Sequence, residues 1–222
     1  MSFQIALDGP AGAGKSTVAK AVAAQLQFIY IDTGAMYRAM GLYFDSQGVD
    51  VNDEAAINAA VDGAKVTIAH QDGTQHIFLN GEDVTTAVRA EKAGMLASKT
   101  SAYGSVRRKL TSMQQEIAEV QNIVMDGRDI GTAVLPNAPL KIYLTASVEE
   151  RAKRRYLELK GKGVDADLAA IAADIEQRDY QDMHREIAPL CQAEDAVFLD
   201  SSDLSAEQVV NRIVELARER MN

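Results

Sequence analysis

Residues Gly9 to Ser16 spell G-P-A-G-A-G-K-S and match the complete motif G-x-x-x-x-G-K-S/T. In this motif, backbone N–H groups surround phosphate oxygens, and the start of the following helix favours negative charge. Lys15 is expected to reach the β- and γ-phosphates, and the Ser16 hydroxyl to bind Mg²⁺. A dinucleotide-binding loop fits worse, because Thr17 stands where its last glycine is needed. The spacing therefore predicts a nucleoside-triphosphate site rather than a glycine-rich turn that binds nothing.

Two carboxylates follow short apolar stretches further along the chain. Asp126 comes directly after Ile123 to Met125, a typical place for a carboxylate that holds Mg²⁺ through water. Capping a turn explains Asp126 equally well locally, and only the phosphate loop, which requires a metal partner, favours the magnesium role. Asp32 is the candidate general base if the phosphoryl acceptor is a hydroxyl.

Arginines are the residues that a phosphate acceptor would require. Such an acceptor is already anionic and needs no base, but two polyanions must be held together in line. The chain has enough arginines to favour a phosphate acceptor over a hydroxyl acceptor. They are Arg38, Arg107, Arg128, Arg154, Arg178 and Arg185.

The segment from Arg151 to Lys162 carries six cations and a single carboxylate, Glu158, in a chain whose net charge is −9. Arg151, Arg154 and Arg155 share one helix face by their spacing. A solvated helix face is one interpretation. A mobile basic lid over the transferring phosphoryl group is the favoured one, because clustered cations neutralise its charge.

The elements that must position these residues alternate between strands and helices along the chain. Strands are expected at residues 3–7, 28–31, 123–126, 140–144 and 196–200. Helices are expected at 15–26, after Thr33 as a cap, at 53–61, at 89–120 with a break near 101–104, after the capping box at Ser147, from about 165, and after Ser205. This order predicts an α/β fold of the P-loop NTPase type, a five-stranded parallel sheet with flanking helices.

Residues 65–84 break that pattern. Two segments, 65–69 and 75–79, alternate between apolar and polar residues, and the turn signals Asp72-Gly73 and Asn80-Gly81 follow them. The pattern predicts a small three-stranded antiparallel insert. We expect this insert to be a lid or a substrate-side subdomain, with inert decoration as the alternative.

Composition excludes several function classes. A net charge of −9 over 222 residues argues against a general nucleic-acid binder. A single cysteine, Cys191, excludes an internal disulfide, and three scattered histidines offer no zinc cluster. No G-x-S-x-G elbow, Cys/His pair or guanine motif is present. Without a signal peptide or an apolar run of membrane length, we expect a cytoplasmic protein with no membrane partner.

Four segments together resemble the bacterial cytidylate (CMP) kinases, a branch of the nucleoside monophosphate kinases. They are 9–17, 32–38 (D-T-G-A-M-Y-R), 126–132 (D-G-R-D-I-G-T) and 178–190, and the likeness extends over essentially the whole chain. The phosphate loop alone is common to many families, whereas the other segments are far more specific. The resemblance implies the reaction ATP + CMP ⇌ ADP + CDP, with dCMP also accepted and Mg²⁺ bound with ATP.

The same resemblance assigns roles to individual residues. It implies that Arg128 and Arg154 join Lys15 in catalysis, Arg154 from the lid. The metal roles of Ser16 and Asp126 rest on the motif and the strand pattern above, since position 16 varies to glycine in the family. ATP would be bound by Gly9, Pro10, Ala11, Gly12, Ala13, Gly14, Lys15, Ser16 and Thr17. The CMP phosphate would be bound by Thr33, Tyr37, Arg38 and Arg128, cytosine by Ser98, Arg107 and Asp129, and the sugar and phosphate by Arg178, Asp182 and Arg185. Gln181 stands where some relatives have another arginine.

We therefore expect one P-loop kinase domain over 1–222 that acts as a monomer. Its core covers about 1–35, 90–150 and 190–222, its CMP-side region with the insert about 36–89, and its basic lid about 151–165. Two alternatives remain open from the residues: a kinase of a small hydroxyl metabolite with Asp32 as the base, and a nucleotide sensor without catalysis. The phosphate acceptor distinguishes the first, and ATP turnover that depends on a monophosphate excludes the second.

Overall fold

The computed structural model describes residues 2–71 and 74–221. The chain forms two compact units, one of residues 1–30 and 121–222 and the other of residues 31–120. The phosphate loop lies in the first unit, and the predicted insert lies in the second. The helices in 91–120, which the sequence analysis groups with the core, belong to the second unit.

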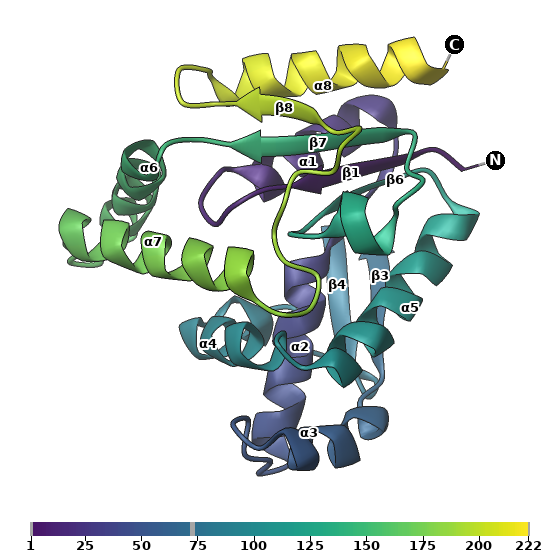
Figure 1. The fold of residues 1–222 in the computed structure, drawn as a ribbon, viewed down its shortest axis with the longest axis vertical. Coiled ribbons are helices and arrows are strands. Elements are labelled where there is room, and N and C mark those ends of the chain that lie inside the picture. The colour runs from purple at the N-terminus through teal and green to yellow at the C-terminus, as the bar shows by residue number, and fades with distance from the viewer. Residues whose placement is uncertain (1, 72–73, 222) are drawn as a thin grey trace. The chain divides into compact units, whose positions relative to one another are not determined.

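A five-stranded parallel sheet in the order β2-β6-β1-β7-β8 confirms the predicted fold class (Figure 1). The strands are β1 (Gln4–Asp8), β2 (Ile29–Asp32), β6 (Ile123–Asp126), β7 (Leu140–Thr145) and β8 (Val197–Asp200). Ile5 pairs with Val124 on one side of β1 and with Leu140 on the other. Because the strands are parallel, the residues that follow β1 and β6 emerge at the same edge of the sheet.

Four helices complete the first unit: α1 (Lys15–Leu26), α6 (Val148–Gly161), α7 (Leu168–His184) and α8 (Ala206–Met221). Val18 and Val22 of α1 share one buried apolar cluster with Ile213 of α8 and with Ile5 and Ile142 of the sheet. Helices α6 and α7 pack side by side (Figure 1). The predicted cap at Ser147 is confirmed, since its Oγ accepts a hydrogen bond from the Glu150 backbone N–H. The reciprocal half of a capping box is replaced, because the Ser147 backbone N–H donates to Ser202 Oγ at 2.9 Å.

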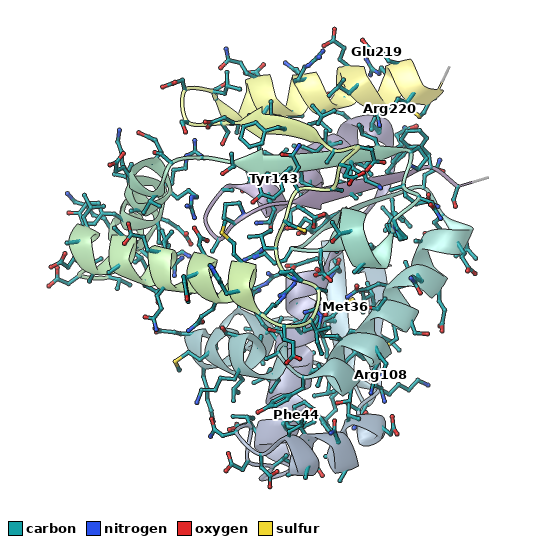
Figure 2. All side chains as sticks on the ribbon, in the orientation of Figure 1. Met36, Phe44, Arg108, Tyr143, Glu219 and Arg220 are labelled. Atoms are coloured by element: carbon teal, nitrogen blue, oxygen red, sulfur yellow. The ribbon has the colours of Figure 1, made fainter. Side chains whose placement is uncertain are left out.

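The second unit contains the predicted antiparallel insert. Its strands are β3 (Val66–Gln71), β4 (Thr74–Leu79) and β5 (Glu82–Asp83), with Ile68 paired to Ile77. The expected turn at 72–73 lies outside the described residues. The helices are α2 (Thr33–Ser46), α3 (Glu54–Ala60), α4 (Glu91–Thr100) and α5 (Gly104–Val120), with short 3₁₀ turns at Val61–Gly63 and Ala87–Arg89. Met36 and Phe44 are buried, whereas Arg108 is exposed (Figure 2).

Two helix starts differ from expectation. Thr33 was predicted to cap α2, but Asp32 is the cap, because its Oδ1 accepts a hydrogen bond from the Ala35 N–H at 2.9 Å. Helix α7 was expected from about 165 and begins at Leu168, after the Asp167 side chain caps the N–H groups of Ala169 and Ala170. Sequence reasoning also missed a π-helical turn over Ile130–Val134.

Candidate functional site

The phosphate loop connects β1 to α1 and requires glycine at its first position. Gly9 has a φ of +146°, and a Cβ there would lie 1.9 Å from the Leu144 carbonyl oxygen. Gly12 and Gly14 also have positive φ values, 76° and 86°. A side chain at Gly9 would therefore collide with β7, and the positive φ values at Gly12 and Gly14 would strain any other residue there. Glycine also leaves the loop backbone accessible to a ligand.

Lys15 is buried, and its Nζ donates a hydrogen bond to the Pro10 carbonyl oxygen at 2.7 Å. Burial and the nearby Arg128 lower the pKa of Lys15 to about 7, against the opposing effect of Asp126 and Asp8. A bound phosphate group would stabilise the charged form of this ammonium with its negative charge. Lys15 is thus placed to exchange a loop carbonyl for phosphate oxygens.

Ser16 and Asp126, the two predicted metal-binding residues, lie in direct contact. Ser16 Oγ donates to Asp126 Oδ2 at 2.8 Å, and Tyr30 Oη donates to Asp126 Oδ1 at 2.9 Å. A hydroxyl and a carboxylate are the hard oxygen ligands that Mg²⁺ prefers. Among the described residues, no group of three or more His, Cys, Asp or Glu side chains could hold a metal by itself. The pair fits an ion that takes its remaining ligands from phosphate and water.

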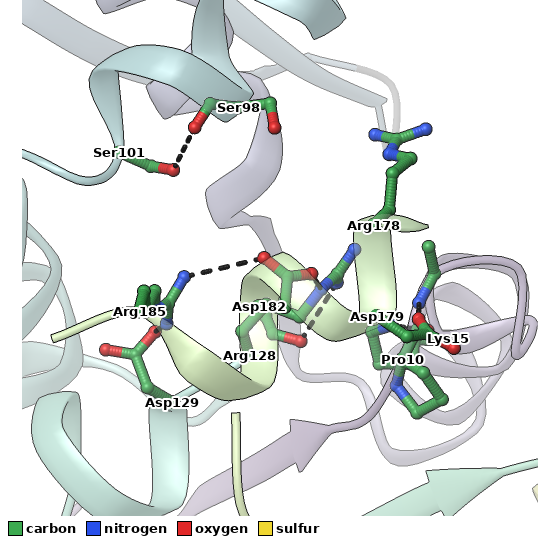
Figure 3. A network of polar contacts seen from close by, with 12 residues as sticks. Pro10, Lys15, Ser98, Ser101, Arg128, Asp129, Arg178, Asp179, Asp182 and Arg185 are labelled. Carbon is green, nitrogen blue, oxygen red and sulfur yellow. Dashed lines mark hydrogen bonds and ion pairs between the residues drawn. The ribbon is translucent and has the colours of Figure 1, made fainter. Parts of the chain in front are cut away.

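Four charged side chains of the first unit form an alternating network (Figure 3). Arg128 Nε donates to Asp182 Oδ2 at 2.8 Å, and Arg185 lies 3.7 Å from Asp182 and 3.1 Å from Asp129. Although burial favours its neutral form, the ion pair with Asp182 holds the pKa of Arg128 above its ordinary value. The structure thus brings together four predicted substrate-binding residues and pairs each arginine with a carboxylate.

Asp8 fixes the loop that carries Arg128 and Asp129. Its two carboxylate oxygens accept hydrogen bonds from the backbone N–H groups of Ile130 and Gly131, both at 2.7 Å. Burial raises the pKa of Asp8 to about 6, and the two backbone hydrogen bonds offset part of that effect. Sequence reasoning missed this residue, although an acidic side chain at the buried end of a strand, directly before Gly9, was a usable signal.

The three arginines predicted to share one face of the basic helix have different surroundings. Arg151 is buried and forms an ion pair with Asp179 at 2.6 Å. Arg154 donates to the hydroxyl and the carbonyl oxygen of Ser201 at 3.2 and 2.6 Å. Arg155 forms a pair with Glu158 at 2.8 Å. Arg151 is therefore held inside the unit, which removes it from the predicted set of lid cations.

The predicted stripe of Arg178, Asp182 and Arg185 is also divided. Arg178 is exposed and lies 3.9 Å from Asp174, one turn earlier. Helix α7 ends at His184, so Arg185 lies beyond it in an extended conformation. Asp182 pairs with Arg128 and also lies 3.7 Å from Arg185, so this half of the stripe is in contact. Arg178 lies outside the charged network because its ion partner is Asp174, on the other side along the helix.

The second unit contributes its own cluster of predicted residues. The Arg107 guanidinium lies 5.5 Å from the ring centroid of Tyr37 and donates to the Ser101 carbonyl oxygen at 3.2 Å. Thr33 is the first residue of α2, and Tyr37 and Arg38 follow in its first turns. Ser98 lies on the exposed side of α4, and its carbonyl oxygen accepts from Ser101 Oγ (Figure 3).

Asp32, the candidate base for a hydroxyl acceptor, makes three contacts. Its Oδ1 caps α2, and its Oδ2 accepts from Arg89 Nη1 at 2.9 Å. Its backbone N–H donates to the Gln75 side-chain oxygen at 2.8 Å, which links the insert to the start of α2. Both carboxylate oxygens of Asp32 are therefore used in supporting the fold.

Comparisons with known proteins agree with the resemblance seen in the sequence. A family model described as cytidylate kinase matches residues 5–219. The chain is 52% identical to a cytidylate kinase of Caldicellulosiruptor bescii, over 96% of this chain and 95% of that protein. It is 49% identical to a cytidylate kinase of Lactobacillus gasseri, over 98% and 95%.

Among solved structures, the fold is similar to that of an uncharacterized protein from Eubacterium ventriosum. That similarity has a TM-score of 0.54 at 12% identity and covers 99% of both chains. Among the residues that the structure describes, no helix combines the length and apolar character needed to cross a membrane.

Proposed function

The chain belongs to the cytidylate kinase family, and we propose that the residues described above carry out one reaction, the transfer of a phosphoryl group from ATP to CMP or dCMP. The protein is a nucleoside monophosphate kinase, a transferase whose acceptor is itself a phosphate group. The observation that carries the assignment of residues is the presence, in one compact unit, of a complete phosphate loop and of the Arg128–Asp182–Arg185–Asp129 network.

The phosphate loop binds the donor in this proposal. The N–H groups of the loop face the β-phosphate, and Lys15 leaves the Pro10 carbonyl oxygen to contact the phosphates. Because Lys15 is buried, its charge acts through a low dielectric and stabilises the negative charge of the transferring group strongly.

Ser16 and Asp126 would hold the magnesium ion, Ser16 directly and Asp126 through water. Their 2.8 Å hydrogen bond supports this assignment, since it places two hard oxygen donors at the start of α1. When bound, Mg²⁺ supplies charge neutralisation on the phosphates. Tyr30 keeps the carboxylate of Asp126 oriented through its second oxygen.

The acceptor phosphate is bound by arginines that exchange partners. Arg128 and Arg185 each contact a carboxylate in the structure. A phosphate dianion competes well for these guanidiniums, because bidentate charge-assisted hydrogen bonds to phosphate are among the strongest in proteins. The released carboxylates then accept from the nucleoside, Asp182 from the sugar hydroxyl and Asp129 from the cytosine amino group.

The second unit carries further residues that we propose for the acceptor. Thr33, Tyr37 and Arg38 serve the CMP phosphate, and Ser98 and Arg107 serve cytosine. The Tyr37–Arg107 contact supports this assignment, because it preorganises a guanidinium that can donate to O2 and N3 of the base. Arg154 would leave Ser201 to reach the transferring group.

The two alternatives are not favoured. A hydroxyl-metabolite kinase would need Asp32 as a general base, but both of its oxygens accept hydrogen bonds from Ala35 and Arg89. A sensor without catalysis would not need a set of arginines that neutralises the negative charge of a transferring phosphoryl group.

A steady-state panel tests the proposal. ADP release is measured with Mg-ATP and, in separate reactions, with CMP, dCMP, UMP, AMP or no acceptor. We expect turnover that depends on the acceptor, with CMP and dCMP preferred. ATP hydrolysis that is independent of any monophosphate, or a preference for a hydroxyl compound, contradicts the proposal.

We also propose that the enzyme acts as a monomer in the cytoplasm. Its single cysteine supports a reducing compartment, where disulfides are rare. Light scattering after size exclusion, at several protein concentrations, is expected to give a mass near 24.0 kDa. A mass of twice that value contradicts the monomer.

A further inference from the structure

The third residue of the phosphate loop, Ala11, has both of its backbone polar groups bound by side chains of helices α6 and α7. Its N–H donates to Asp179 Oδ1 at 3.3 Å, and its carbonyl oxygen accepts from Arg151 Nη1 at 2.9 Å. Arg151 and Asp179 are in turn 2.6 Å apart. We propose that this Arg151–Asp179 pair, here called the brace, is the positioning device that holds the phosphate loop in its ATP-binding shape.

The brace acts on the peptide that Lys15 must release. In the structure, the Pro10–Ala11 peptide is held from two sides, by Lys15 Nζ on its carbonyl oxygen and by Asp179 on its N–H. When Lys15 turns to the phosphates of ATP, only the contact with Asp179 remains on this peptide. Asp179 then keeps the loop from turning with the lysine, so the following N–H groups stay directed at the ligand.

Arg151 supports the neighbouring peptide in the same way. Besides the Ala11 carbonyl oxygen, it contacts the Ala146 carbonyl oxygen through Nε at 2.9 Å, which fixes its side chain at the end of β7. Its Cβ would lie 3.3 Å from a Cβ placed on Gly12. The loop therefore rests against the stem of Arg151, and any larger residue at position 12 would disturb that contact.

The charge balance of the brace explains why a carboxylate is tolerated near a triphosphate. An unpaired aspartate at the loop would repel ATP, but both residues are buried and their side chains form a close ion pair. The pair is neutral as a whole, so it orients the backbone without adding net charge to the phosphate site. A buried ion pair is weak evidence for stability, so we assign this pair to orienting the loop.

This inference rests on the proposed function, since it assigns Asp179 to the ATP site. The test measures KM for ATP, KM for CMP and kcat in Asp179→Asn, together with the dissociation constant for Mg-ATP by calorimetry. We expect the affinity for ATP to fall about tenfold, because the carboxamide loses the ion pair that orients it. KM for CMP should change much less. The matched control is Glu176→Gln, an exposed position one turn earlier on α7, which should leave all four values unchanged.

A double variant separates positioning from folding. Asp179→Leu combined with Arg151→Met removes the brace but leaves no buried charge unpaired, a replacement that is often neutral for stability. We expect a normal melting temperature with the same loss of ATP affinity. Normal ATP affinity in the folded double variant, or a lowered melting temperature as the only effect of Asp179→Asn, overturns the inference. If the wild-type protein fails to phosphorylate CMP, the proposed function fails instead, while calorimetry with Mg-ATP still decides the role of the brace.

Discussion

The carboxylate of Asp8 accepts a hydrogen bond from the backbone N–H of Gly131 at 2.7 Å, and its second oxygen accepts equally closely from Ile130. One buried side chain at the end of β1 therefore sets the conformation of the loop that follows β6. The ionised carboxylate accepts both bonds at full strength, whereas protonation turns one oxygen into a hydroxyl, which is a donor and a weaker acceptor. The geometry of Arg128 and Asp129 thus depends on the charge of Asp8.

This dependence predicts an acid-sensitive step. The pKa of Asp8 is raised to about 6, so the carboxylate gains its proton as the pH falls through that value. We expect kcat/KM for CMP to fall below about pH 6. The CMP phosphate itself titrates near pH 6, so the measurement is the ratio of wild type to Asp8→Asn across pH 5 to 8. The ratio should be largest at neutral pH and approach one in acid.

Stability should respond to Asp8 in the opposite direction. The folded pKa lies above the ordinary value of 3.8, so the folded state binds the proton more tightly than the unfolded chain does. The contribution of this group to the free energy of unfolding therefore rises as the pH falls from about 6 towards 4. Activity and stability that both decline in this window, relative to Asp8→Asn, would contradict the assignment.

Much of the fold was predictable from local signals. The strand, glycine loop and helix of residues 3–26, the cap at Ser147 and the alternation in the insert each have short-range causes, and all appear in the structure. Side-chain partners that lie far apart in the sequence were not predictable. Asp179 accepts a hydrogen bond from Ala11, 168 positions away in the sequence. In the sequence, Arg151 is one of several cations on a helix, and nothing nearby indicates its buried partner Asp179. Periodicity gives the face of a helix, but it does not tell which residue across the fold will neutralise a charge.

Replacement of the loop lysine should remove activity and preserve the fold. Lys15 is buried, but it donates to a loop carbonyl and lies outside the apolar core cluster of the first unit, so Lys15→Ala leaves that cluster intact. We expect kcat to fall at least about a hundredfold, as is typical for loss of one oriented charge stabiliser. The melting temperature and circular dichroism should remain close to those of wild type. Near-normal kcat would show that this loop is not the donor site.

Arg154 should act on the rate more than on acceptor binding. The proposal requires it to exchange Ser201 for the transferring phosphoryl group. Arg154→Ala is therefore expected to lower kcat more than it raises KM for CMP. The control is Arg155→Ala, whose exposed partner is Glu158 and which should have no effect. A change in KM alone would make Arg154 an ordinary binding residue. No change in either constant would contradict the lid role and favour the alternative interpretation, a solvated helix face.

Asp129 offers the most selective test, because its proposed role depends on the base. In the structure it is buried and paired with Arg185 at 3.1 Å. If it accepts from the cytosine amino group, Asp129→Ala should lower kcat/KM for CMP by roughly tenfold to a hundredfold, since a charged hydrogen bond contributes about 1.5–3 kcal/mol. Uracil presents a carbonyl at that position and gains nothing from a carboxylate.

The loss of the Arg185 partner complicates the absolute rates, and a ratio removes this complication. Both substrates carry the same phosphate, so any displacement of Arg185 lowers their rates alike. The ratio of CMP to UMP efficiency should therefore fall in Asp129→Ala whatever happens to each rate alone. In Arg185→Ala, where the phosphate contact is lost instead, the ratio should stay close to that of wild type. Equal losses for CMP and UMP in Asp129→Ala would assign this carboxylate to holding Arg185, and base selection to other residues.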